Sequence, residues 1–180
     1  MESQKISVLL MYLHLQKRLF YFLILSLLPL VGRPQGHEER LHQINVLHYT
    51  FALELADTTD EIRGRAEMKI EFNDRADEFF LDLVSPGANG EGMKVEAVNS
   101  DAKAIPFEQR GDSLVLRLPA GRERGDLLTL EIDYRGIPAD GLIISRNKYG
   151  ARTFFGDNWP NRARHWLPCV DHPSDKATVE

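Results

Sequence analysis

Apolar and polar residues alternate along the middle of the chain with the period of a β-strand. Between residues 47 and 55 the odd positions are apolar, whereas between residues 62 and 72 the apolar side chains occupy even positions and the charges occupy odd ones. Successive side chains of a strand point to opposite faces, so each run has one face for a core and one for water. The turn-forming residues 56–60 lie between the two runs, which predicts an antiparallel hairpin.

Further runs with strand character occur at residues 78–84, 93–99, 113–118 and 128–134. Stretches rich in Gly, Pro, Asn and Asp at residues 85–90, 109–112 and 119–125 separate them. These residue types form turns. Beyond residue 32 no stretch sustains an apolar stripe at helical spacing. The predicted fold class is therefore all-β, either an antiparallel β-sandwich or a curved, saddle-like sheet. We expect its core to be led by Tyr49, Phe51, Leu53, Met68, Ile70 and Phe72.

The first 32 residues have the pattern of a secretory signal peptide. Lys17 and Arg18 precede an apolar run at residues 19–31, which is shorter than the about 20 residues that a membrane span requires. We expect residues 1–32 to be removed on export, with a short membrane anchor as the alternative, and residues 33–44 to be a linker. The mature protein is then secreted, periplasmic or held in the cell envelope, with no stable membrane insertion.

Composition limits the classes of function. Hydrophobic residues make up 43% and charged residues 27% of the chain, which is typical of one globular domain. After residue 32, 19 Lys and Arg face 26 Asp and Glu, a net charge of −7 that disfavours nucleic acid as a partner. Cys169 is the only cysteine, so an intrachain disulfide is excluded. We interpret Cys169 as a packed residue and not as a nucleophile.

The segment from residue 156 to residue 176 is too dense in rings, prolines and charges to alternate as a strand. Its pattern is Arg164-x-Trp166-Leu167-Pro168-Cys169-x-Asp171-x-Pro173-Ser174-x-Lys176, and a bend with the pattern Tyr134-x-Gly136-x-Pro138-x-x-Gly141-Leu142 precedes it. Both elements resemble the end of the N-terminal domain in the aminopeptidase N family of zinc metallopeptidases. The resemblance implies that residues 45–180 form this β domain, truncated at its C-terminal end.

The hydrolytic centre of that family, His-Glu-x-x-His on a helix, is not in this sequence. The near match at residues 37–42 spaces His37 and His42 five positions apart, about 140° out of line on a helix. We therefore expect no catalytic residue, no metal ligand and no cofactor in this chain, and the resemblance implies zinc in a missing catalytic domain of the same polypeptide. A paired zinc site from His165 and His172 is the weaker alternative to packing or hydrogen-bonding roles.

In relatives, a Gln-x-Glu-Ala-like stretch just before the shared arginine reaches the active site and helps to hold the free amine of the substrate. An ungapped count places the glutamine position at Asp157 and the glutamate position at Trp159, which become the substrate-binding candidates. Asp157 can accept hydrogen bonds from an ammonium group, and Trp159 can offer a cation–π face. The alternative is a turn that only packs. Arg162 and Arg164 are expected to project together and to pair with Asp171 or Asp175.

The resulting hypothesis is a structural and substrate-anchoring N-terminal domain of a secreted, zinc-dependent aminopeptidase that releases N-terminal amino acids from peptides. Its partners would be the catalytic domain and peptide substrates, and the chain alone would be inactive. Two alternatives stay open: an exported β-sandwich that binds without catalysis, and a homologue whose zinc site has degenerated. The sequence that follows Glu180 would discriminate between them.

Overall fold

The computed structural model describes residues 43–180. The predicted signal peptide, nearly all of the predicted linker, and His37 and His42 lie outside the described residues. Apart from one turn of 3-10 helix, the regular secondary structure of the described part consists of strands, which confirms the all-β fold class. In this part, no helix has the length and apolar character that a membrane crossing requires.

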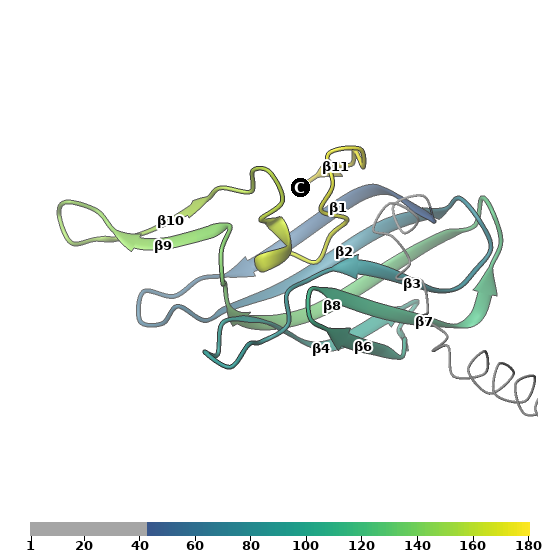
Figure 1. Ribbon diagram of the computed structural model, residues 1–180, viewed down its shortest axis with the longest axis horizontal. Helices are drawn as coiled ribbons and strands as arrows, with labels where there is room; N and C mark the ends of the chain where they lie inside the picture. The colour runs from purple at the N-terminus through teal and green to yellow at the C-terminus, as the bar shows by residue number, and fades with distance from the viewer. Residues whose placement is uncertain (1–42) are drawn as a thin grey trace, which may run out of the picture. The chain divides into compact units, whose positions relative to one another are not determined.

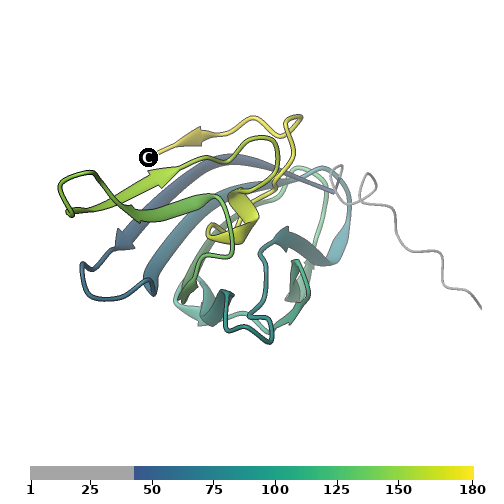
Figure 2. The same cartoon turned by 60° about the vertical axis from the view of Figure 1, so that its left-hand side comes forward.

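The strands form three sheets, two of which enclose the core (Figures 1 and 2). The six-stranded sheet has the order β11-β1-β2-β8-β4-β5, the three-stranded sheet has the order β3-β7-β6, and the third sheet is the hairpin of β9 and β10. The bounds are β1 (Ile44–Glu54), β2 (Ile62–Phe72), β3 (Ala76–Asp82), β4 (Gly92–Ser100), β5 (Lys103–Ala104), β6 (Phe107–Arg110), β7 (Ser113–Arg122), β8 (Leu127–Ile137), β9 (Leu142–Arg146), β10 (Arg152–Gly156) and β11 (Thr178–Val179).

The predicted hairpin is β1 and β2, which pair in antiparallel register with Tyr49 opposite Met68. The alternation of β2 is as predicted, since Ile62, Met68 and Phe72 are fully buried. In β1 the register shifts between Val46 and His48, so a bulge reverses the parity of the strand. The expectation that all odd positions face the core is therefore wrong for Leu47, which is 40% exposed.

The core lies between the six-stranded and three-stranded sheets. Phe72 of β2 meets Phe79 of β3 edge to face, with 5.5 Å between the ring centroids. Tyr134 of β8 lies across Gly64 of β2 so closely that a Cβ at residue 64 would be 2.2 Å from the Tyr134 ring. Tyr49, Met68, Ile70 and Phe72 are buried as expected, whereas Phe51 and Leu53 are only partly buried and pack against the margin of the core.

Short strands escaped the sequence pattern. Residues 109 and 110 were expected to belong to a turn, but they end β6, which pairs with β7. The predicted separator at residues 119–125 is shortened in the same way, because β7 continues to Arg122. Neither β9 nor β10 was predicted, because each has only five residues and no deep alternation of burial.

The difference in depth between Phe79 and Phe51 predicts a difference in stability. Phe79→Ala removes a fully buried ring and is expected to lower the free energy of unfolding by about 3–5 kcal/mol. Phe51→Ala removes a partly exposed ring and is expected to cost about 1–2 kcal/mol. Urea denaturation of residues 33–180 measures both values, and equal losses would contradict the placement of Phe51 at the margin.

Candidate functional site

Residues 156–176, named here the closing segment, leave β10 and run without a regular ladder to β11. The single turn of 3-10 helix at Ala163–His165 lies in its middle. Two backbone hydrogen bonds between Asp82 and Cys169 join the segment to the end of β3, at 2.7 and 3.1 Å, and the Val84 N–H donates to the Arg164 carbonyl oxygen at 2.9 Å. The irregular packing predicted for this stretch is therefore confirmed.

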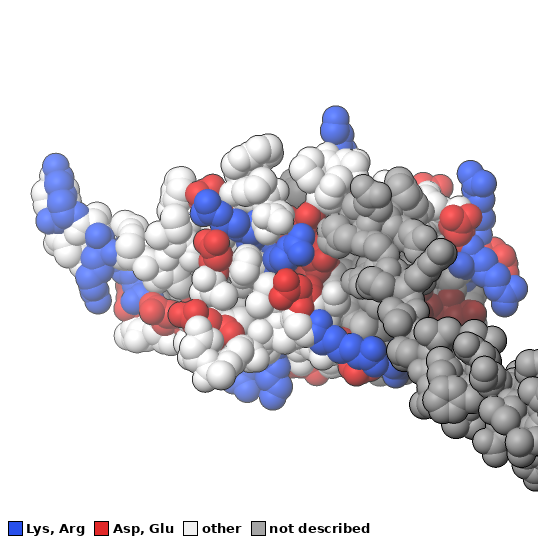
Figure 3. All heavy atoms as spheres, viewed as in Figure 1, with Lys and Arg blue, Asp and Glu red and all other residues white. Residues whose placement is uncertain are grey.

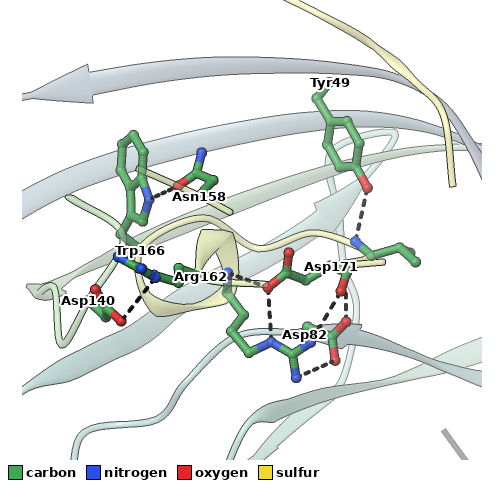
Figure 4. Close-up of polar contacts among 9 residues, drawn as sticks. Tyr49, Asp82, Asp140, Asn158, Arg162, Trp166 and Asp171 are labelled. Carbon is green, nitrogen blue, oxygen red and sulfur yellow. Dashed lines mark hydrogen bonds and ion pairs between the residues drawn. The ribbon is translucent and has the colours of Figure 1, made fainter. Parts of the chain in front are cut away.

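A buried group of three charged side chains holds the segment (Figure 4). Arg164 Nε donates to Asp171 Oδ2 at 3.0 Å, and Arg164 Nη1 lies 3.8 Å from Asp82 Oδ1. The Asp171 backbone N–H donates to Asp82 Oδ2 at 2.9 Å. The three side chains are only 14%, 8% and 13% exposed, in the order Arg164, Asp171, Asp82. The predicted pairing of Arg164 with Asp171 is confirmed, and Asp82 joins it from β3.

Cys169 lies next to this group and is buried with a free thiol. Burial raises the pKa of the Cys169 thiol well above its ordinary value, and the charges of Asp171 and Asp82 raise it further. A thiol of this kind stays protonated, so it is a poor nucleophile. The interpretation of Cys169 as a packed residue agrees with this environment.

Two contacts tie the far end of the closing segment to β1. The Val170 N–H donates to the Tyr49 hydroxyl oxygen at 3.0 Å, and the Val46 N–H donates to Asp175 Oδ1 at 3.4 Å, next to the bulge. Burial raises the pKa of the Tyr49 phenol. Burial also raises the pKa of the Asp175 carboxyl, although the bond from Val46 opposes the shift. Asp175 Oδ2 is buried and accepts no hydrogen bond in the described part of the chain.

The start of the segment is fixed to the turn between β8 and β9. Trp166 Nε1 donates to Asn158 Oδ1 at 2.9 Å, as Figure 4 shows. The Trp166 ring and the Arg162 carbonyl oxygen press against Gly141, where a Cβ would come within 2.3 Å of that oxygen. Gly141 also has φ = +77°, a backbone conformation that disfavours other residues. The glycine of the predicted bend is therefore required by conformation and by contact.

The two substrate-binding candidates lie on this side. The Asp157 N–H donates to the Gly141 carbonyl oxygen at 2.7 Å, and Arg162 Nη1 donates to Asp157 Oδ2 at 3.1 Å. Arg162 Nε also lies 3.7 Å from Asp140 Oδ2. Trp159, which is joined to Pro160 by a cis peptide bond, is 74% exposed. Asp157 is thus paired and oriented, while the Trp159 indole is open.

The expected partner of Arg162 is wrong. The prediction placed Arg162 and Arg164 on one side of an extended segment, both paired with Asp171 or Asp175. Arg162 precedes the 3-10 turn at Ala163–His165 and Arg164 lies within it, so the chain is not extended here. Arg162 pairs with Asp157 and Asp140, and only Arg164 reaches Asp171. Asp82, Asp140 and Asn158 were missed as partners. Asp82 is 89 residues from Asp171, beyond the reach of any local pattern, whereas Asn158 is only eight residues from Trp166 and no motif marked it.

A groove with a volume of about 360 Å³ runs between β1, β11 and the closing segment. Its walls are mainly apolar and include Tyr49, Phe51, Trp159, Pro160, Leu167 and Val179. Within residues 43–180, no three His, Cys, Asp or Glu side chains are grouped so that they could hold a metal ion. His172 is engaged with Ser174 at 2.7 Å. Zinc was expected in a missing catalytic domain and not among these residues, and the absence of zinc binding by this chain stays a prediction.

Comparison with known proteins identifies the family to which the chain belongs. The model of the peptidase M1 N-terminal domain family matches residues 45–180, and the chain belongs to that family. The sequence resemblance to zinc metallopeptidases of the aminopeptidase N type is thereby confirmed. Among curated proteins, no sequence matches the chain.

Solved structures agree with this assignment. An M1 zinc metallopeptidase from Deinococcus radiodurans is 26% identical with a TM-score of 0.63, over 77% of this chain and 31% of that one. Yeast LTA4 hydrolase in complex with bestatin is 25% identical with a TM-score of 0.64, over 76% of this chain and 22% of that one. The chain thus spans less than a third of the length of either protein.

The two arginines of the closing segment are expected to differ in their effect on stability. Arg164→Met leaves Asp82 and Asp171 buried without their cation and should lower the free energy of unfolding by about 3–5 kcal/mol near neutral pH. Arg162→Met is the matched control, because its ion pairs are more than a third exposed, and it should cost no more than about 1 kcal/mol. Chemical denaturation compares them, and equal small losses would refute the role of Arg164.

Asp175 predicts a pH dependence. Because burial raises its pKa in the folded protein, the folded state binds the proton more tightly than the unfolded state. Proton binding to Asp175 therefore stabilises the folded state. This contribution is complete at a pH below the ordinary carboxyl pKa and is lost as the pH rises through the raised pKa of Asp175. Asp175→Asn abolishes this titration and keeps an oxygen for the Val46 N–H. The variant should have the higher urea midpoint at about pH 7, with the difference shrinking toward about pH 3. A constant difference would contradict the assignment.

Proposed function

We propose that this chain contributes the N-terminal domain of an exported, zinc-dependent aminopeptidase whose catalytic domain belongs to the same polypeptide. The observation that supports this most directly is the family match over residues 45–180, together with the similarity to M1 zinc metallopeptidases that are much longer. Zinc and the residues that bind it would come from the catalytic domain, where the metal would supply activation of water for hydrolysis of the peptide bond. In this proposal the residues of this chain bind the peptide substrate and orient it.

The surface of the closing segment and its neighbours supports a partner domain. Large apolar side chains that are exposed include Ile143 and Phe155 on the β9–β10 hairpin, Trp159 in the closing segment and Val179 on β11. Single exposed apolar residues need no explanation, but several on connected elements are typical of an interaction surface. The apolar groove beside Trp159 extends this surface. We assign it to contact with the catalytic domain.

Asp157 and Trp159 are the residues that we assign to substrate anchoring. Asp157 and Asp140 share the guanidinium of Arg162, so the group carries one net negative charge. A substrate ammonium can neutralise that charge by a charge-assisted hydrogen bond to Asp157. Trp159 presents its indole to the same cation or to the first side chain of the peptide.

Export is the second part of the proposal. A basic pair followed by an apolar run at residues 19–31 is typical of a secretory leader. The mature enzyme would then act outside the cytoplasm on extracellular or periplasmic peptides. Determining the N-terminal residue of the exported protein tests this part, and a mature chain that still contains the apolar run at residues 19–31 would refute leader removal.

Activity is tested on the natural polypeptide. Its sequence beyond Glu180 should contain His-Glu-x-x-His, and the purified protein should release free N-terminal amino acids from peptides and lose that activity on zinc chelation. Residues 33–180 alone should release none. A natural polypeptide that stops at Glu180 would overturn the proposal in favour of a binding module, and a continuing one without zinc ligands would favour a degenerate homologue.

Asp157→Ala in the complete enzyme is expected to lower kcat/KM for peptides with a free N-terminus. The loss of transition-state stabilisation should be about 1.5–3 kcal/mol, because the bound ammonium would lose its anionic partner. Peptides with an acetylated N-terminus should be affected little. Trp159→Ala is the companion variant. If only Trp159→Ala lowers kcat/KM, the ammonium contact belongs to Trp159; if neither does, residues 156–160 act only in packing.

A further inference from the structure

The β9–β10 hairpin is a sheet with two strands and two open edges (Figures 1 and 2). Hydrogen bonds from the Asn147 N–H to the Ala151 oxygen and from the Asp157 N–H to the Gly141 oxygen fix the phase of the ladder. In an antiparallel ladder, bonded pairs alternate with pairs whose backbone groups point outward. Phe155 and Ile143 are therefore a bonded pair, whereas the N–H and carbonyl of Phe154 point away from β9.

These outward groups of Phe154 take part in no hydrogen bond with any residue between 43 and 180. An exposed edge of this kind is a template for another extended chain. Two-stranded sheets are also marginally stable by themselves in water. The unpaired N–H and carbonyl groups on the outer edge of β10 can thus form hydrogen bonds with one more strand.

The two faces of the hairpin differ. Phe154 and Ile144 lie opposite each other on the inner face and pack against the core, partly buried. Phe155 and Ile143 lie opposite each other on the outer face and are 63% and 43% exposed. The outer face therefore carries an exposed apolar pair, with Ile143 on β9 and Phe155 on β10. Strand β10 leads directly into Asp157.

The charge of the hairpin is opposite to that of the domain. Residues 142–156 contain three basic residues and no acidic residue, whereas the chain after residue 32 is acidic. Figure 3 shows basic side chains at the hairpin tip, on the left. Arg152 is held by Asp60, but Arg146 donates only to the Gly150 carbonyl and Lys148 lies 4.9 Å from the Tyr149 ring. In residues 43–180, Arg146 and Lys148 have no carboxylate partner.

We propose that an extended segment of the longer polypeptide, from the part that follows Glu180, pairs with the outer edge of β10. Apolar side chains of that segment or its neighbours cover Phe155 and Ile143, and acidic residues meet Arg146 and Lys148. The choice of β10 over β9 follows from continuity, because β10 runs into Asp157 and the surface that we assign to the catalytic domain. This inference rests on the proposed function in requiring a longer polypeptide.

Amide hydrogen exchange tests the pairing residue by residue. The Phe154 amide should exchange at least about 100-fold more slowly in the natural polypeptide than in residues 33–180 alone. The Ile144 amide, which faces outward on the opposite edge, is the internal control and should change little. The Phe155 amide is already bonded to Ile143 and reports hairpin opening. Fast exchange at Phe154 in both proteins, or slowing at Ile144 instead, would overturn the proposal.

Matched variants test the two recognition features. Phe155→Ser and Lys148→Glu should each reduce the protection of the Phe154 amide in the natural polypeptide by about 10-fold. Leu127→Ser, at a residue 66% exposed, and Lys103→Glu, in exposed β5, are the controls and should leave it unchanged. Equal effects of variants and controls would refute the interface.

Peptide hydrolysis by the same preparation separates the two proposals. Hydrolysis without protection of Phe154 would refute this pairing and leave the proposed function standing. Protection of Phe154 without hydrolysis would support the pairing and refute the function. A natural protein that ends at Glu180 would overturn both.

Discussion

The buried group of Arg164, Asp171 and Asp82 is the interaction on which the closing segment depends. Residues 156–176 have no strand ladder, so their conformation must be set by side chains and a few backbone bonds. Replacing a buried ion pair by apolar residues often costs nothing, but removing one member leaves an uncompensated charge. The cost of losing Arg164 would therefore come mainly from the two carboxylates left without a cation. Because the group joins the closing segment to β3, it also helps to position the two ends of that segment, which lead to β10 and to β11.

The two arginines divide the closing segment into an inner and an outer part. Arg164 turns inward to Asp82 and Asp171, where little water enters, and Arg162 turns to Asp157 and Asp140, where more than a third of each side chain is exposed. A single 3-10 turn produces this separation within three residues. The inner group of Arg164, Asp82 and Asp171 is mostly shielded from water, and its contacts join the closing segment to β3. The outer group carries a net negative formal charge in contact with solvent, and this is the feature on which the proposed ammonium contact rests.

The sequence predicted the parts of the domain where local pattern and tertiary environment agree. In β2 every second residue is buried against the other sheet, so periodicity alone identified the strand and its faces. In β1 a bulge reversed the parity after Val46, and periodicity cannot reveal a bulge because the apolar residues continue on both sides of it. The contact of Arg164 with Asp171 was predictable from seven residues of separation. Asp82 was not, because it is 89 residues from Asp171.

The site could be predicted only as positions, not as geometry. An ungapped count placed Asp157 and Trp159 where the hairpin ends, but Arg162 was assigned to the wrong carboxylate because an extended conformation was assumed. The structure also shows a connection between the β9–β10 hairpin and the closing segment that the sequence does not reveal. Gly141 accepts the Asp157 N–H, and the Trp166 ring packs against it. The last rung of the hairpin is thus also the first contact of the closing segment.

This link has a consequence for any strand that pairs with β10. Such a strand would restrain Phe154 from the outer edge, while the bond between Asp157 and Gly141 restrains the chain from the inner edge. Asp157 lies three residues beyond Phe154 on a backbone that would then be held on both sides. Its carboxylate is oriented by Arg162 from the closing segment, which is itself held through Arg164. If both proposals hold, the position of the ammonium contact would be determined jointly by an internal ion pair and by the strand that pairs with β10.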